Sequence, residues 1–333
     1  MRLLGRVMFF IIGNRTDSVM KRKAVLALGG NAILRAGQKG TVEEQFVNTK
    51  ESIQGIIELI KQDYQLAITH GNGPQVGNLL LQQQTGLSMG VAPLSLSILN
   101  AATEGTMGYM IGQCIENGLH ETGLKNKVVT IITQVVIDVN DPSFQNPTKP
   151  VGPFYSEEDA IKLREEFGWH IVEDSGRGYR QIVPSPIPID ILQAGIIKEL
   201  VEEDVLVIAC GGGGIPVYYD EQGMLNGGDA VIDKDFASAL LAKEIEADLL
   251  MILTGVEKVA VNFGKPDQKD LDRISLREAK YYLQRGDFPA GSMGPKIRAA
   301  INFLEGGGRE VVITSVEKIV EALAGKTGTV IYE

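Results

Sequence analysis

Short runs of apolar residues alternate along this chain with segments in which apolar residues recur every three or four positions. The first pattern is typical of strands buried on both faces, and the second of helices that bury one face. Between residues 43 and 62, for example, apolar residues recur at helical spacing from Phe46 to Ile60. The remaining predicted helices lie near 235–245, 275–284 and 295–305, and the predicted strands lie at 25–28, 66–70, 128–137, 205–210, 248–254 and 310–314.

This alternation predicts an α/β fold with a mainly parallel sheet that helices cover on both faces. Pro74 follows the turn at residues 71–73 and suits the first turn of another helix. Residues 138–155 are rich in Pro, Asn and Asp, and we expect little regular structure there. Residues 171–183 predict a β-hairpin that turns around 175–178.

Composition excludes several classes of function. The 333 residues carry a net charge of −10 and no sustained basic patch, which argues against a nucleic-acid or anionic-membrane partner. The two cysteines, Cys114 and Cys210, lie far apart and in no paired motif. We therefore expect reduced thiols and a cytoplasmic protein.

The first twenty residues do not fit the alternation. Residues 7–13 form an apolar stretch that loosely resembles a signal peptide, but the stretch is short and no clear small-residue cleavage site follows it. It is also too short to span a bilayer. The interpretation we favour is that translation starts at Met20 and that residues 1–20 are an extension outside the native chain.

Three of the predicted strands run directly into glycine-rich turns. Glycine lets the backbone approach a ligand closely, and free N–H groups at the start of a following helix attract anions. A chain that repeats this device is expected to handle phosphate. The turns are Gly29-Gly30-Asn31, Gly71-Asn72-Gly73 and Gly211-Gly212-Gly213-Gly214.

Two common phosphate-binding folds do not fit these turns. Gly325-Lys326-Thr327 imitates the end of a P-loop, but Val320 occupies the position of the required earlier glycine. A dinucleotide-binding fold needs an acidic residue about 20 positions beyond its glycine turn, and none follows Gly73 before Glu104.

Two lysines stand where helices are predicted to begin. Lys234 and Lys296 both lie in a predicted first helical turn, where a cation opposes the helix dipole unless an anion is bound. Together with the glycine turns, they favour a clamp around phosphate.

Seven segments carry a family resemblance, and they occur in the expected order from about Lys23 to the C-terminus. The chain resembles the carbamate kinases, within the amino acid kinase family. The resemblance implies a three-layer αβα sandwich, with a carbamate-binding lobe at 21–200, a protruding subdomain at about 138–180 and a nucleotide-binding lobe at 201–333. The segments are 27–32, 70–78, 146–150, 173–178, 183–186, 230–238 and 291–296.

The reaction implied by the resemblance is reversible: ATP and carbamate give ADP and carbamoyl phosphate. Relatives mostly run it towards ATP, at the end of arginine or purine-derivative breakdown, and are homodimers. Mg²⁺ would bridge the nucleotide phosphates, and we see no carboxylate cluster for an all-protein metal site. The carbamate oxygen is already anionic, so that the transfer needs positioning and charge neutralisation rather than a general base.

The resemblance also implies roles for individual residues. Lys149 would reach over the site from the subdomain, Lys234 and Lys296 would hold the nucleotide phosphates, and Asp235 would orient these lysines. The substrate cradle would be the backbone of Gly29, Gly30, Asn31, Gly71, Asn72 and Gly73, with Gly211, Gly212 and Gly213 at the lobe junction. The residues that would border the nucleotide are Thr254, Gly255, Val256 and Met293.

Several residues have a plainer interpretation. His70 is more readily explained by packing under its turn than by catalysis, and Arg177 by bracing the hairpin. Asn31 and Asn72 either contact the ligand or only satisfy the turn geometry. The sequence departs from the family at Ser95 and Glu104, where relatives commonly carry Asp and Gln; this segment would border the substrate lobe or the dimer contact.

Two alternative functions remain open. The first is a kinase for another acidic acceptor, such as acetylglutamate or a nucleoside monophosphate. Such relatives usually place a lysine before the first glycine pair, where this chain has Ala27 and Leu28. The second is a non-catalytic sensor of nucleotide or carbamoyl phosphate, which would not need the whole set of lysines.

Overall fold

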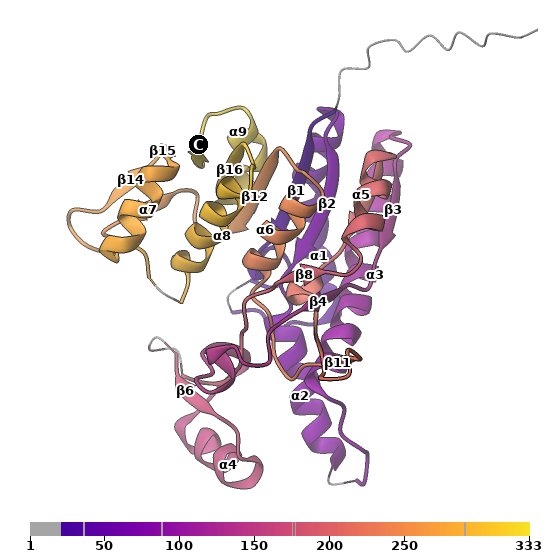
Figure 1. Ribbon diagram of the computed structural model, residues 1–333, viewed down its shortest axis with the longest axis vertical. Helices are drawn as coiled ribbons and strands as arrows, with labels where there is room; N and C mark the ends of the chain where they lie inside the picture. Colours follow the sequence, from indigo (N-terminus) through magenta and orange to yellow (C-terminus); the bar gives the residue numbers. More distant parts are fainter. Residues whose placement is uncertain (1–20, 36, 88, 175, 177, 290) are drawn as a thin grey trace, which may run out of the picture.

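The computed structural model describes residues 21–333, except residues 36, 88, 175, 177 and 290 and the side chain of Asn31. An eight-stranded sheet runs through the molecule in the order β15-β17-β16-β12-β1-β2-β9-β3 (Figure 1). Neighbouring strands are parallel, except for the antiparallel pair β16–β17. The strands are β1 (Lys23–Leu28), β2 (Gln65–His70), β3 (Lys127–Thr130), β9 (Val205–Ile208), β12 (Leu249–Thr254), β15 (Arg273–Ser275), β16 (Glu310–Ser315) and β17 (Thr329–Tyr332).

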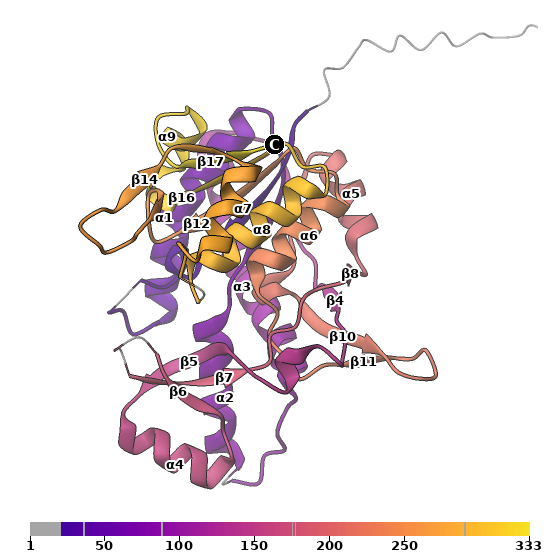
Figure 2. The same cartoon turned by 60° about the vertical axis from the view of Figure 1, so that its left-hand side comes forward.

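Helices cover both faces of this sheet (Figure 2), and β1 shows how the sequence produces this arrangement. Successive side chains of a strand point to opposite faces. Leu26 packs in a core with residues of α1 and α3, whereas Val25 packs in a second core with residues of α5, α6 and α8. The predicted three-layer αβα sandwich is confirmed. The helices are α1 (Val42–Lys61), α2 (Gly73–Leu87), α3 (Leu96–Thr122), α4 (Glu157–Phe167), α5 (Ala194–Glu202), α6 (Lys234–Glu244), α7 (Leu276–Arg285), α8 (Met293–Glu305) and α9 (Ile319–Leu323).

Local capping explains where several helices begin and end. Thr41 and Glu44 form a capping box at the start of α1, each side chain accepting from the other residue's backbone N–H. Ser95 caps α3 by accepting from the N–H of Ile98, and α3 ends at Gly123, whose φ of 73° suits glycine. The predictions for α1, α2, α6, α7 and α8 are confirmed within a few residues. No helix was predicted over α3, the longest of the described helices.

The predicted strand over 128–137 is wrong as a single element. The structure divides it into β3 and β4 (Gln134–Val136), which belong to different sheets. The chain leaves the main sheet at Thr133, because the Thr133 backbone N–H donates to the Glu104 carboxylate and its Oγ1 accepts from the Cys210 backbone N–H. Because these contacts join residues far apart in the sequence, the β-branched composition of the segment does not predict them.

The expectation of little regular structure over 138–155 is also wrong in part. Lys149–Tyr155 forms β5, an edge strand of a small antiparallel sheet in the order β5-β7-β6. Two prolines are tolerated there because one side of an edge strand forms no ladder hydrogen bonds and needs no backbone N–H. The register between β5 and β7 also shifts between Val151 and Tyr155. The predicted hairpin is confirmed as β6 (Ile171–Glu173) and β7 (Tyr179–Val183); residues 175 and 177, and with them the prediction for Arg177, lie outside the described residues.

This small sheet and α4 project from the end of the molecule near α2 (Figures 1 and 2). They dock on α2 through a close approach of two backbones. A Cβ on Gly77 would lie 1.8 Å from the Cα of Gly152, and Gly152 itself has a φ of 77°. Only glycine at residue 77 therefore lets β5 lie against α2.

Two further sheets complete the described structure. One is four-stranded, β11 (Leu225–Gly227), β10 (Ile215–Tyr219), β4 and β8 (Asp190–Ile191), and the other pairs β13 (Val259–Val261) with β14 (Lys269–Leu271). The division into lobes at residues 200 and 201 remains a prediction, and β9 pairs with β2 and β3 across it.

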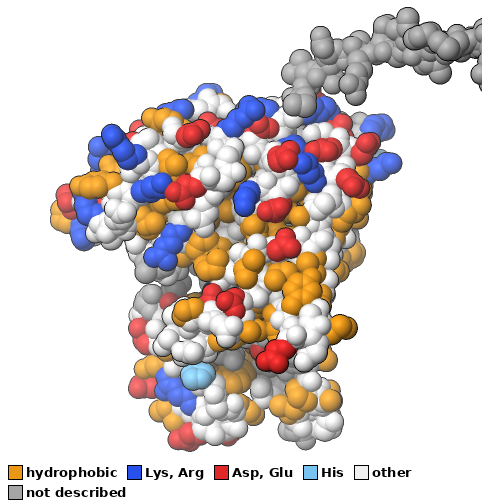
Figure 3. Space-filling model, viewed as in Figure 1, with side chains coloured by type: hydrophobic (Ala, Val, Ile, Leu, Met, Phe, Trp, Pro, Cys, Tyr) orange, Lys and Arg blue, Asp and Glu red, His pale blue; other side chains and the backbone are white. Residues whose placement is uncertain are grey.

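The surface carries both signs of charge. Lys and Arg are interspersed with Asp and Glu over the upper part of the face in Figure 3. Among the described helices, none combines the length and the apolar content that a bilayer crossing requires.

Candidate active site

A cavity of about 810 Å³ lies where the strands of the main sheet end. The carboxyl ends of parallel strands meet at one edge of a sheet, and the loops that follow them gather there. Gly30 follows β1, Gly71 and Gly73 follow β2, and Gly212 follows β9. The start of α6, the start of α8 and β5 close the other sides.

Most of the predicted site residues meet at this cavity. Among the residues that line it are Gly30, Gly71, Asn72, Gly73, Gly212, Lys149, Lys234, Asp235 and Lys296. Gly29, Gly211, Gly213, Thr254, Gly255, Val256 and Met293 are not among the described lining residues, and the side chain of Asn31 lies outside the described part of the chain. Their roles toward a ligand remain predictions.

Close packing explains three of the glycines that do not line the cavity. A Cβ on Gly29 would lie 2.4 Å from the carbonyl oxygen of Leu253, at the end of β12. A Cβ on Gly211 would lie 2.5 Å from Nε2 of His70, and one on Gly213 would lie 2.4 Å from a backbone oxygen. Gly30, in contrast, has no atom within 4 Å of its Cβ position, so its backbone is open to the cavity.

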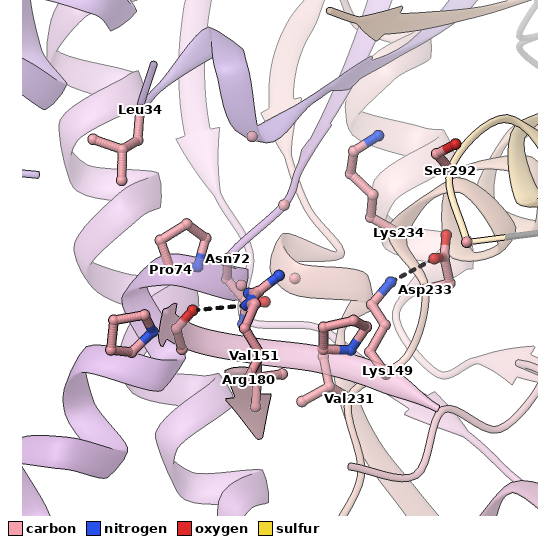
Figure 4. Close-up of a pocket in the computed structure, with 18 of the residues that line it drawn as sticks. Leu34, Asn72, Pro74, Lys149, Val151, Arg180, Val231, Asp233, Lys234 and Ser292 are labelled. Atoms are coloured by element: carbon pink, nitrogen blue, oxygen red, sulfur yellow. Dashed lines mark hydrogen bonds and ion pairs between the residues drawn. The ribbon is translucent and has the colours of Figure 1, made fainter. Parts of the chain in front are cut away.

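Five of the charged side chains of the cavity form one connected cluster. Lys234 and Lys296 both donate to the carboxylate of Asp235, Lys296 at 3.0 Å. Lys149 reaches in from β5 and donates to Oδ2 of Asp233 at 2.5 Å (Figure 4). The other oxygen of Asp233 accepts from the Asp235 backbone N–H, which joins the two pairs. Three lysines against two aspartates leave an excess of positive charge.

The pKa shifts follow from burial and from these pairs. Asp235 is 3% exposed, and burial alone would raise its pKa, but the two lysines hold it well below the usual range. Burial lowers the pKa of Lys234; Asp235 opposes this and nearby Lys296 adds to it. Burial also acts to lower the pKa of Lys296, but Asp235 reverses the sign and raises it. The ion pairs therefore favour the charged forms of Asp235 and Lys296 in spite of burial.

Helix ends add to the positive potential. α6 begins at Lys234 with Asp233 as its N-cap, and α8 begins beside the cavity at Met293, with no side chain capping it. Backbone N–H groups at such an end carry partial positive charge and attract anions. The cavity can thus receive an anion from several directions at once.

Sequence reasoning missed four charged residues of this cavity, Arg35, Lys39, Asp233 and Arg180. Asp233 lay within a matched segment without a role, although Asp directly before a predicted helix is an N-cap signal. Arg180, on β7, also lines the cavity and donates from Nε to the carbonyl of Gly152 at 3.1 Å. Arg180 carried no sequence signal, because only the fold of the small sheet brings it to the cavity.

The floor of the cavity rests on α3. Nδ2 of Asn72 donates to Asn100 at 3.0 Å and to Thr103 at 2.9 Å, so its amide hydrogens anchor the turn. His70 is 1% exposed, its Nδ1 lies 3.2 Å from the Gly71 carbonyl, and burial lowers its pKa to about 4. The predicted packing of His70 under the turn is confirmed.

The two residues at which the sequence departs from the family pattern, Ser95 and Glu104, lie in different surroundings. Ser95 caps α3, whereas Glu104 is 2% exposed behind the glycine turns. Oε2 of Glu104 accepts from the Thr133 N–H at 2.7 Å, and burial raises its pKa to about 8. Glu104 therefore lies against the floor of the cavity.

Comparison with known proteins gives consistent matches over nearly the whole chain. A model of the amino acid kinase family matches residues 22–315. The carbamate kinase of Thermococcus kodakarensis is 52% identical over 310 residues, which are 92% of this chain and 98% of that protein. The carbamate kinase of Pyrococcus furiosus is 50% identical over 311 residues, 93% and 99% of the two chains. The solved carbamate kinase from Giardia lamblia bound to AMP-PNP superposes with a TM-score of 0.85 at 43% identity, covering 94% of this chain and 98% of that one.

Proposed function

The chain belongs to the amino acid kinase family, and within it we propose that it acts as a carbamate kinase. It would transfer a phosphoryl group between ATP and carbamate, giving ADP and carbamoyl phosphate. The observation that carries the proposal is the meeting of Lys149, Lys234 and Lys296 at one cavity. Half of the aligned residues are identical to those of named carbamate kinases.

Phosphoryl transfer needs the reacting oxygens in line and the charge on the transferred group neutralised. The open backbone at Gly30 and at residues 71–73 would hold the carbamate and the transferred phosphoryl group through N–H donors. Lys149 would approach that group from one side, and Lys234 and Lys296 from the other. Because they are fixed in place, their charge would stabilise the transition state without reorganisation.

The two aspartates of the cluster would act as positioning residues. Asp235 holds the ammonium groups of Lys234 and Lys296 together, and Asp233 holds that of Lys149. Neither carboxylate is free to abstract a proton. This suits carbamate, whose oxygen is already anionic.

Mg²⁺ would accompany the nucleotide in this proposal. The described residues contain no cluster of three or more His, Cys, Asp or Glu side chains that could hold a metal ion. Since Asp233 and Asp235 are engaged by lysines, the donor set fits a metal held mainly by the nucleotide phosphates. The ion would supply charge neutralisation on those phosphates.

The wider setting of the enzyme is proposed by analogy with its relatives. We infer a homodimer in the cytoplasm that serves ATP formation in arginine or purine-derivative breakdown. Cys114 and Cys210 are free and buried, which suits a reducing compartment. We propose no nucleic-acid partner, in keeping with the net charge of −10 and with the mixed charges on the face in Figure 3.

The other functions considered from the sequence are not favoured. Ala27 and Leu28, at the position where kinases of other acids place a lysine, are both buried in β1. A sensor without activity would not need three lysines held in place by two aspartates.

The proposal is tested by ATP formation from ADP and carbamoyl phosphate in a coupled assay. Lys149→Ala should lower kcat by at least about a hundredfold, as loss of a transition-state donor does, while ADP binding is retained. Lys162→Ala, on exposed α4 of the same subdomain, is the matched control and should retain activity. The wild-type protein forming no ATP above background would rule out a carbamate kinase.

A further inference from the structure

Glu104 is a buried carboxyl group with half of its hydrogen-bonding capacity unused. It lies in α3 and is 2% exposed. Oε2 accepts from the Thr133 N–H at 2.7 Å, whereas Oε1 is buried and has no hydrogen-bond partner. Leaving a buried ionised carboxylate half-satisfied is costly, so this group needs an explanation.

The glycine turn at Gly211 is in direct contact with Glu104. The position that a Cβ on Gly211 would occupy lies 3.0 Å from Cγ of Glu104 and 2.5 Å from Nε2 of His70. The next residue, Gly212, lines the cavity, and His70 leads directly into the other cradle turn at residues 71–73. Glu104 thus lies immediately behind both turns.

No cation neutralises Glu104 within the described part of the chain. Burial raises its pKa, and the N–H of Thr133, which donates to Oε2, and the nearby N–H of Gly211, which makes no hydrogen bond to Oε1, lower it only in part. The titratable groups that face it are His70 of β2 and Cys210, whose buried thiol has a raised pKa. The elements α2 and β10, which also pack on α3, contain no charged residue, and neither α1 nor β3 supplies a charge that shifts Glu104.

His70 brings no positive charge to Glu104. Its Nδ1 is within hydrogen-bond distance of the Gly71 carbonyl, which can only accept, so Nδ1 carries the proton. The pKa of His70, lowered to about 4 by burial, keeps the ring neutral and leaves Nε2 as an acceptor on the side of Gly211. A protonated carboxyl group suits this environment, because burial opposes the ionised form and no charged group among the described residues offsets it.

We propose that Glu104 is a positioning residue that works as a neutral acid behind the anion cradle, and that its ionisation weakens binding of the carbamoyl phosphate anion. The inference rests on the proposed function. Ionised Glu104 would place an unpaired negative charge behind the turns at residues 71–73 and 211–213, where the low dielectric preserves its repulsion of a bound phosphate. The protonated form leaves the positive potential of the lysines unopposed.

The test is the pH dependence of KM for carbamoyl phosphate, measured between pH 6 and 9.5. In the wild type, KM should rise about tenfold across the ionisation near pH 8, with a smaller change in KM for ADP. Glu104→Gln, an isosteric neutral side chain, should keep the low KM at every pH. Any loss of kcat from deprotonation of Lys234 should be the same in the wild type and in Glu104→Gln. It can therefore be distinguished from the effect of Glu104 on KM.

Glu116→Gln is the matched control, since Glu116 is on the exposed face of the same helix and should behave as the wild type. If wild type and Glu104→Gln share one KM profile, the inference fails while the proposed function stands. If neither forms ATP, the proposed function fails, and infrared titration then decides about Glu104. A protonated carboxyl band that disappears near pH 8 and is absent from Glu104→Gln supports the neutral acid, and its absence from the wild type overturns it.

Discussion

Replacing Glu104 by glutamine should stabilise the protein, and by an amount that grows with pH. The pKa of this carboxyl is raised from 4.5 to about 8 in the folded protein. Between these values the native state keeps a proton that the unfolded state releases, so the stability of the wild type falls as pH rises and levels off above pH 8. Glutamine does not titrate and removes this pH-dependent penalty.

The magnitude follows from the pKa difference. Each pH unit above 4.5 costs the wild type about 1.4 kcal/mol, so the advantage of Glu104→Gln should be about 1 kcal/mol at pH 5.5 and about 4 kcal/mol at pH 7.5. The amide can retain the bond from the Thr133 N–H through its oxygen. The expected change between the two pH values is therefore about 3 kcal/mol.

Denaturant unfolding at pH 5.5 and 7.5 measures this difference, with Glu116→Gln as the control on the same helix. The midpoint for Glu104→Gln should exceed that of the wild type, and the gap should widen at the higher pH with unchanged slope. A gap of the same size at both pH values would refute the reasoning, because it would mean that Glu104 is ionised in the native state or that the substitution acts only through packing.

Three further substitutions test the cavity. Asp235→Asn leaves two buried lysines without a carboxylate and should cost about 3–5 kcal/mol of stability, seen as a lower unfolding midpoint that saturating ATP partly restores; an unchanged midpoint without nucleotide would contradict the cluster. Asp233→Asn frees Lys149 and should lower kcat about tenfold with little change in KM for ADP, whereas an equal loss in both constants would count against a positioning role. Gly77→Ala should displace the small sheet from α2 and lower kcat while ADP binding, measured by calorimetry, is kept; full activity would show that the close approach to Gly152 is not needed.

The sequence predictions were correct for elements that depend on local residue patterns, and they failed where contacts between distant residues decide the structure. The strands around β1 and the helices α1, α6 and α8 were predictable because burial on both faces, or on one face, leaves a periodic trace in the residues themselves. The helix α3 was missed, although it carries Glu104 and anchors Asn72. The split of 128–137 into two strands was also missed, since contacts of Thr133 with distant residues end the first strand.

The sequence by itself determined the αβα layering, the family and the lysines expected around phosphate, because apolar periodicity and ordered motifs are local properties. Only the tertiary structure decided which glycines face the cavity and which serve packing, and that Asp233 and Arg180 join the cavity. It also decided that Glu104 is buried behind the cradle turns. These outcomes depend on contacts between segments far apart in the chain, and the burial and charge balance of a group arise only once those segments pack together.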